Sequence, residues 1–140
     1  MTLPPGLRAA YEATDYRVFS DPPLVLRPGE ASPGCDALLD RHDAARGVVI
    51  TAWNPMSVAT AEPENRAAQA RLAAGIAAMG LAAIPAEGAG RDGLWPPEPS
   101  LFVPGLSPEA AQRLARDFRQ AAVLEITRGG AARVVATDFG

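Results

Sequence analysis

The stretch GVVITAWNPMSVATAEPENR, from Gly47 to Arg66, joins an apolar segment to the start of a helix. Residues 48–53, VVITAW, are apolar and rich in β-branched side chains, which is typical of a buried strand. A helix is predicted from Glu62 to Met79, because Pro63 suits a first helical turn and the nearby acids favour the positive end of the helix dipole. Gly80 then supplies a stop. The stretch therefore predicts the strand and helix of one βαβ-like unit.

The chain that follows repeats this order of elements. Ser107 and Pro108 mark a second helix start, with a hydroxyl cap and a proline in the first turn. The hairpin near the end of the chain is expected to turn at Gly129 and Gly130. The other elements predicted here are strands at 81–86, 100–105 and 121–126, a loop at 87–99 and a closing hairpin at 127–136.

The N-terminal part has a weaker pattern. A short helix is predicted at 7–15, two strands at 16–20 and 23–28 around a proline-rich turn, and one or two helical turns at 36–45. The whole chain then predicts a single α+β domain over residues 1–140, with its core at about 47–137 and N-terminal strands, a loop and a short helix in 1–46. We expect a two-layer sandwich with a ferredoxin-like βαββαβ core, an N-terminal strand pair and a C-terminal hairpin strand. A small doubly wound sheet is the alternative.

Composition excludes several kinds of chemistry. The net charge of −3 argues against a nucleic-acid partner, which usually needs a basic face. All 13 basic residues are Arg, so Schiff-base chemistry and a P-loop Lys are both absent. One cysteine gives neither an internal disulfide nor a cysteine-based zinc site. We therefore predict no cofactor and no metal site.

The start of the chain and its apolar runs bear on location. The N-terminus lacks the basic and apolar regions of a signal peptide, and the longest weakly polar run is too short for a bilayer. These features favour a cytoplasmic protein without a membrane partner. A small-molecule ligand or a protein partner stays open, and the oligomeric state is not predicted.

Four pieces of the chain occur together in a recognisable order: ITAWNPMS, ENRAAQARL, GLWPPEPSLFVPG and FRQAAVLE. Together they resemble an uncharacterised bacterial family, domain of unknown function 3293, over residues 48–126. Arg119 stands where the family pattern implies a small, Gly-like residue. The resemblance implies no known activity. It singles out Thr51, Trp53, Asn54, Pro55, Ser57, Glu64, Asn65, Trp95, Glu98, Ser100, Phe118 and Gln120.

The same polar residues form a candidate site from first principles. Pro55 is expected to hold Asn54 in an extended conformation at a stiff strand tip, where its amide offers both a donor and an acceptor. In a ferredoxin-like sheet the first and third strands are antiparallel neighbours. The end of one, at Asn54, would then meet the start of the other, at Glu98 and Ser100. We expect the site at this end of the sheet.

Three functions remain open at this point. A binding domain would hold a small polar ligand, and an interaction module would present a sheet edge or the acidic surface to a protein. A small hydrolase or group transferase would use Glu98 as its catalytic general acid or base. Structural roles are the alternative for each residue: turn or helix caps for the amides, core anchors for the tryptophans and an exposed acid for Glu98. The predicted ligand-binding residues are Trp53, Asn54, Ser57, Asn65, Trp95, Ser100 and Gln120.

Overall fold

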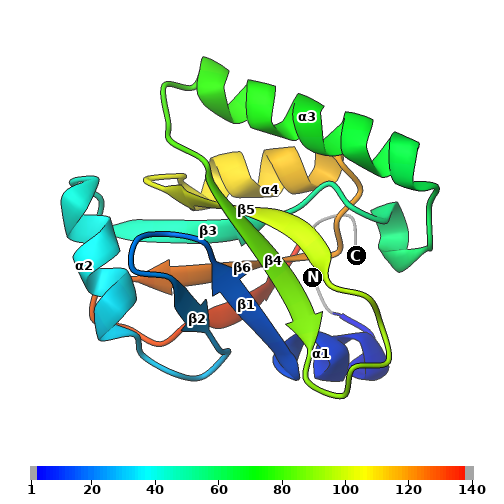
Figure 1. Ribbon diagram of the computed structural model, residues 1–140, viewed down its shortest axis with the longest axis horizontal. Helices are drawn as coiled ribbons and strands as arrows, with labels where there is room; N and C mark the ends of the chain where they lie inside the picture. Colours follow the sequence, from blue (N-terminus) through cyan, green and yellow to red (C-terminus); the bar gives the residue numbers. More distant parts are fainter. Residues whose placement is uncertain (1–2, 138–140) are drawn as a thin grey trace.

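The computed structural model describes residues 3–137 and places seven strands in one antiparallel sheet (Figure 1). The strand order is β2-β1-β4-β5-β3-β6-β7. The elements are α1 (Pro5–Glu12), β1 (Thr14–Val18), β2 (Leu24–Leu26), α2 (Pro33–Arg41), β3 (Arg46–Ile50), η1 (Pro55–Ser57), α3 (Glu62–Ala78), β4 (Ile84–Gly90), β5 (Glu98–Pro104), α4 (Pro108–Asp117), β6 (Ala122–Thr127) and β7 (Arg133–Ala136).

The α+β class predicted from the sequence is confirmed, and the local differences have physical causes. The predicted loop at 87–99 is shorter than expected, because β4 and β5 pair as far as Gly88 and Glu98. Helix α2 begins at Pro33, before the helical turns predicted at 36–45, since the Ser32 hydroxyl accepts a hydrogen bond from the Cys35 backbone N–H at 3.1 Å. In the middle of the sheet the strand order is β4-β5-β3-β6.

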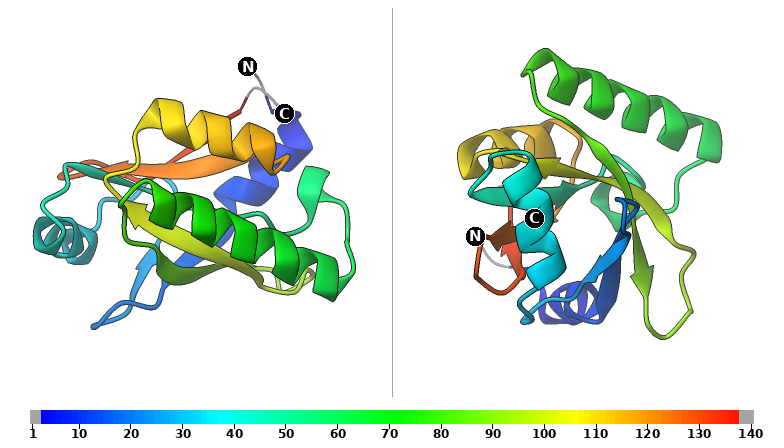
Figure 2. Two further views of the ribbon diagram at one scale, coloured as in Figure 1. Left: turned by 90° about the horizontal axis from the view of Figure 1, so that it is seen from above. Right: turned by 60° about the vertical axis from the view of Figure 1, so that its left-hand side comes forward.

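One face of the sheet is covered by α3 and α4, which lie side by side across it (Figure 2). Val48 and Ile50 of β3 point to this face, where they pack against Leu72 and Ile76 of α3 and Leu114 of α4. Each of these aliphatic side chains is almost fully buried. Apolar burial of this extent, on the order of 2 kcal/mol for each large side chain, fixes both helices on the sheet.

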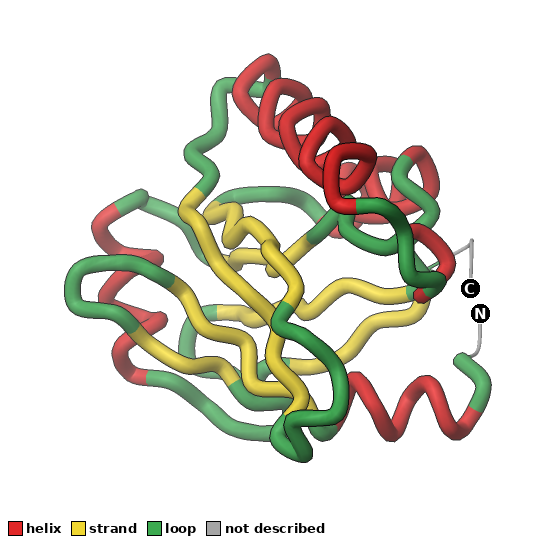
Figure 3. The backbone as a smooth tube through the Cα atoms, turned by 45° about the vertical axis from the view of Figure 1, so that its right-hand side comes forward, coloured by secondary structure: helices red, strands yellow, loops and turns green. Residues whose placement is uncertain are grey.

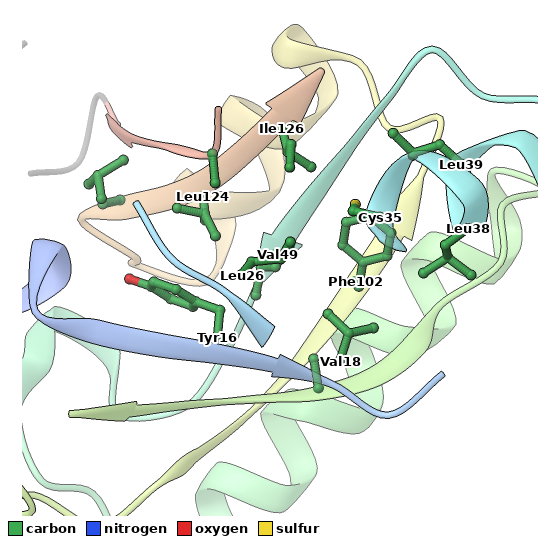
Figure 4. Packing of buried hydrophobic residues seen from close by; sticks show 14 of the residues in the cluster. Tyr16, Val18, Leu26, Cys35, Leu38, Leu39, Val49, Phe102, Leu124 and Ile126 are labelled. Carbon is green, nitrogen blue, oxygen red and sulfur yellow. The ribbon is translucent and has the colours of Figure 1, made fainter. Parts of the chain in front are cut away.

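The other, concave face of the sheet encloses a second core. The predicted two-layer sandwich did not include this additional packed layer. Val49 and Phe102 point into this core from the sheet, while Leu39 reaches it from α2 (Figure 4). Helix α1 adds Leu7 and Tyr11 at its edge. Helices α1 and α2 therefore pack on the side of the sheet opposite to α3 and α4.

The sheet curls until its two ends meet. Pro28, after β2, forms an isolated bridge with Ala132, and Ala31 forms another with Ala131 just before β7. The Gly29 backbone N–H donates to the Ala132 carbonyl at 2.7 Å. Because these bridges join the strands at the two ends of the order, the concave core is enclosed along the sheet as well as by α2.

Side-chain size varies along the enclosed face. Near the Gly47 end of β3 the interior is filled by the ring of Phe102 and by Leu39. At the opposite end of the strands the inward positions of β4 are Gly88 and Gly90, which have no side chains to fill the space. The interior is therefore packed at one end and hollow at the other.

We predict that Gly47→Ala destabilises the protein by about 1–3 kcal/mol through overpacking. A Cβ atom at residue 47 would lie 2.4 Å from Cζ of Phe102 and 3.3 Å from Cδ2 of Leu39. Urea unfolding of the variant and the wild type measures this difference. Gly75→Ala is the matched control: its nearest contact would be Leu114 Cδ2 at 3.9 Å, and we expect a gain of about 0.5–1 kcal/mol in helix α3. Equal stability of Gly47→Ala and wild type would contradict the packing described here.

Candidate functional site

A cavity of about 380 Å³ opens at the hollow end of the sheet. Helix α1 and the loop between β4 and β5, whose backbones are drawn in Figure 3, both contribute to its lining. The Arg91 backbone N–H in this loop donates to the Ala13 carbonyl after α1 at 3.1 Å, which holds the two segments together. Leu94, in the same loop, is 85% exposed. The polar and aromatic side chains lining the cavity are Tyr11, Thr14, Tyr16, Thr51, Asn54, Ser57, Asp92, Trp95, Glu98, Ser100 and Gln120.

The turn after β3 has an unusual backbone. Asn54, Met56 and Ser57 all have positive φ values, of 47°, 62° and 58°. The expectation of an extended Asn54 was therefore wrong: the residue is left-handed, although Pro55 follows it. Asn tolerates this conformation better than most residues, and a turn built this way persists only where its surroundings hold it.

Asn65 of α3 supplies that support. Its Oδ1 accepts a hydrogen bond from the Asn54 backbone N–H at 2.8 Å, and its Nδ2 donates to Asn54 Oδ1, also at 2.8 Å. The Asn54 Oδ1 also accepts from the Thr60 backbone N–H at 3.0 Å, while Asn65 Nδ2 donates to the Thr60 carbonyl at 3.1 Å. As whole residues, Asn54 and Asn65 are 7% and 2% exposed. The pair ties the turn to the first part of α3 and commits the Asn54 oxygen to the turn.

Gln120 supports the same turn from the other side. Its Nε2 donates to the Trp53 carbonyl at 3.2 Å and to the Phe118 carbonyl at 3.1 Å. The Met56 backbone N–H donates to the Arg119 carbonyl at 2.9 Å. The end of α4 and the end of β3 are thereby joined beneath the cavity.

Glu98, at the start of β5, is the half-buried carboxyl group of this site. Trp95 Nε1 donates to Glu98 Oε2 at 2.9 Å. Burial raises the Glu98 pKa, and hydrogen bonds from the Trp95 and Asn54 side chains only partly offset this shift. Burial also raises the pKa of the Tyr11 phenol, whose hydroxyl hydrogen-bonds to the Ser57 side chain. The site therefore combines a carboxyl group that is costly to ionise with two neighbouring hydroxyl groups.

The end of β3 and the start of β5 meet, as the sequence predicts. Some of the predicted site residues line the cavity and others do not. Trp53 and Asn65 do not line the cavity: Trp53 contributes its carbonyl to Gln120, and Asn65 acts through Asn54. Ser100 does line it, although its hydroxyl donates to the Glu98 carbonyl at 3.3 Å. The remaining predicted residues on the cavity wall are Asn54, Ser57, Trp95, Glu98 and Gln120.

Sequence reasoning missed the N-terminal wall of the cavity. Tyr11 and Leu7 come from α1 and Tyr16 from β1, which were assigned to a region outside the core. The Tyr16 hydroxyl donates to the Tyr11 carbonyl at 3.3 Å. In Figure 4 this hydroxyl points away from Val49 and Phe102. The alternation of Tyr16 and Val18 along one strand was the available signal that this tyrosine faces inward.

A family model described as "Protein of unknown function (DUF3293)" matches residues 50–123, just over half of the chain. The chain belongs to the DUF3293 family. No curated protein and no solved structure gave a match. The part matched by DUF3293 contains the turn after β3, α3, β4, β5 and α4, whereas α1 and β1 lie outside it.

The departure at Arg119 from the expected DUF3293 pattern has a backbone explanation. Arg119 follows the C-cap of α4 and has a φ of 55°, in the left-handed region that glycine adopts most readily. The small residue that the resemblance implies there therefore suits a helix end, and needs no ligand to explain it.

Neither a metal site nor a membrane span emerges from the described part of this DUF3293 chain. Within residues 3–137, no group of three or more His, Cys, Asp or Glu side chains is arranged to hold a metal ion. The helices described in the same range are all too short or too polar to cross a bilayer.

We predict that Glu98→Gln stabilises the protein increasingly as the pH rises above about 4.5. The folded state holds the Glu98 proton more tightly than the unfolded state does, so wild-type stability declines from the unfolded pKa up through the raised folded pKa. The Gln side chain keeps an acceptor for Trp95 without this cost. Urea unfolding of both proteins across acidic to neutral pH measures the difference.

Glu64→Gln, at the exposed start of α3, is the control for general charge effects. If the stability difference between Glu98→Gln and wild type does not change with pH, burial does not raise the pKa of Glu98.

Proposed function

We propose that this protein binds a small amphipathic molecule in the cavity between α1 and the hollow end of the sheet. The observation that carries the proposal is the unequal lining of the cavity: polar groups gather around Glu98, while Leu7, Val49, Leu94 and Leu124 contribute apolar surface elsewhere. Ligand sites commonly combine an apolar wall with a few converging polar groups. The cavity volume of about 380 Å³ lies within the usual range for a small organic molecule.

Preorganisation supports the same proposal. The Asn54–Asn65 pair and Gln120 fix the turn at the polar end, so a ligand would not need to order it. Binding sites whose polar groups are already held lose less conformational entropy when they are occupied. Three residues of this turn adopt the unfavourable left-handed backbone conformation. Backbone strain of this kind tends to occur at functional sites, which supports a binding role for the turn.

A ferredoxin-like core gives this site its position. We propose that β3-α3-β4-β5-α4-β6 forms such a unit, with β1, β2 and β7 added at its edges. The order β4-β5-β3-β6 and the placement of α3 and α4 on one face support this description. The unit would supply the Asn54 and Glu98 end of the site, and the added N-terminal segment would supply its second wall.

Catalysis is the second candidate function, and the raised pKa of Glu98 favours it. A half-buried carboxyl group whose pKa is raised by burial holds its proton more tightly than an exposed one, which suits a general acid in hydrolysis or group transfer. Tyr11 and Ser57 lie at the same end of the cavity and would orient a substrate. The pH dependence of Glu98→Gln tests the first requirement of this role, since a Glu98 with an ordinary pKa would not serve.

We predict that the cavity binds N-phenylnaphthylamine, a neutral apolar dye whose fluorescence rises when it leaves water. The variant Gly88→Phe should weaken this binding by about tenfold or more, because its ring would occupy the cavity. A Cβ atom at Gly88 meets nothing closer than Thr14 Cγ2 at 3.5 Å, so the backbone leaves room for the first atom of the new side chain. A fluorescence titration of each protein gives the dissociation constants.

Glu87→Phe is the matched control. Residue 87 is the next residue of β4, on the face away from the cavity, where Glu87 pairs with Arg17 at 2.8 Å. This variant should bind the dye like the wild type. Absence of dye binding by the wild type, or equal binding by Gly88→Phe, would overturn the proposed function.

A further inference from the structure

We infer that the ligand of this cavity is an organic cation, an ammonium group carried on an apolar body. The inference deepens the proposed function and rests on it. It follows from the lining of the cavity, which contains acidic and aromatic side chains but no basic ones among the described residues.

The charged side chains of the lining are all acidic. Glu98 and Asp92 line the cavity, and no Arg or His does so among the described residues. The nearest arginine in sequence, Arg91, is turned to the outside, where its Nη1 pairs with Asp15 at 3.4 Å and its Nη2 donates to the Glu12 carbonyl at 3.1 Å. An anionic ligand would therefore meet carboxylates without a compensating basic group, and its burial would be costly.

Aromatic rings stand around the same carboxyl group. Tyr11, Tyr16 and Trp95 all line the cavity, and the Trp95 indole is fixed by its hydrogen bond to Glu98. The ring of Tyr16 lies against Gly88, since a Cβ atom there would be 3.7 Å from ring atoms Cδ1 and Cε1. Ammonium groups bind favourably over the faces of such rings, and ring clusters beside a carboxylate are a common way to recognise them.

A cation would also offset the free-energy cost of burying the Glu98 carboxylate. The hydrogen bonds from Trp95 and Asn54 do not fully offset the burial of this carboxyl group. An ammonium group placed against it would supply the missing opposite charge inside a site with limited solvent. A neutral alcohol would fill the same apolar space but would leave the Glu98 charge uncompensated.

The test uses phenylbutylamine, phenylbutanol and phenylbutanoate, which share one carbon skeleton and differ in the charge of the end group. Isothermal titration calorimetry at neutral pH should give the amine an affinity about tenfold or more above that of the alcohol, with the carboxylate weakest. Glu98→Gln should lower amine affinity by about tenfold while changing alcohol affinity by less than about threefold. Glu87→Gln removes a carboxylate that lies outside the cavity, where it pairs with Arg17, and this variant should bind all three compounds like the wild type.

The outcomes separate the two claims. Equal affinity for amine and alcohol, or a preference for the carboxylate, would overturn the cationic ligand and leave cavity binding in place. Amine binding that is insensitive to Glu98→Gln would overturn it as well. If the wild type binds none of the three compounds and also fails to bind N-phenylnaphthylamine, the proposed function itself is overturned.

Discussion

Two buried side chains, Asn54 and Asn65, hold the turn on which the rest of this site depends. Both side-chain oxygens and the Asn54 backbone N–H have partners, so the cost of the left-handed backbone is offset within the turn itself. Removing the Asn65 amide would leave the Asn54 backbone N–H without its acceptor, and removing the Asn54 amide would do the same to the Thr60 backbone N–H. The pair also leaves the Asn54 amide nitrogen available to Glu98, across the end of the sheet.

The cavity arises from side-chain size rather than from an opening between domains. The sheet curls until its two ends join, and large residues such as Phe102 fill one end of the interior. Glycines at 88 and 90 leave the other end hollow. Helix α1 and Trp95 then cover this end with aromatic and aliphatic surface, so a polar cluster around Glu98 faces an apolar wall.

The sequence predicts the individual helices and strands well, but it does not predict that the sheet curls until its two ends join. Helix α4 follows from Ser107, whose side chain accepts from the Ala110 backbone N–H as expected. The meeting of Asn54 with Glu98 follows from the antiparallel pairing of β3 with β5, which the expected ferredoxin-like order of the strands predicted. The wall formed by Tyr11 depends on how far the sheet curls, which no local pattern specifies. The left-handed Asn54 was missed because the hydrogen bond that its backbone N–H donates to Asn65, in the next helix, overrides the preference set by Pro55.

A double-mutant cycle on Asn54 and Asn65 tests the central claim most directly. Asn54→Gly keeps a residue that adopts the left-handed backbone without strain, and Asn65→Ala removes the opposing amide. Urea unfolding of both single variants and the double variant gives their coupling energy. The interlocked pair predicts a coupling of about 1–3 kcal/mol, with the double variant less destabilised than the sum of the singles. Losses that add within about 0.5 kcal/mol would contradict the account, because the two side chains would then act independently.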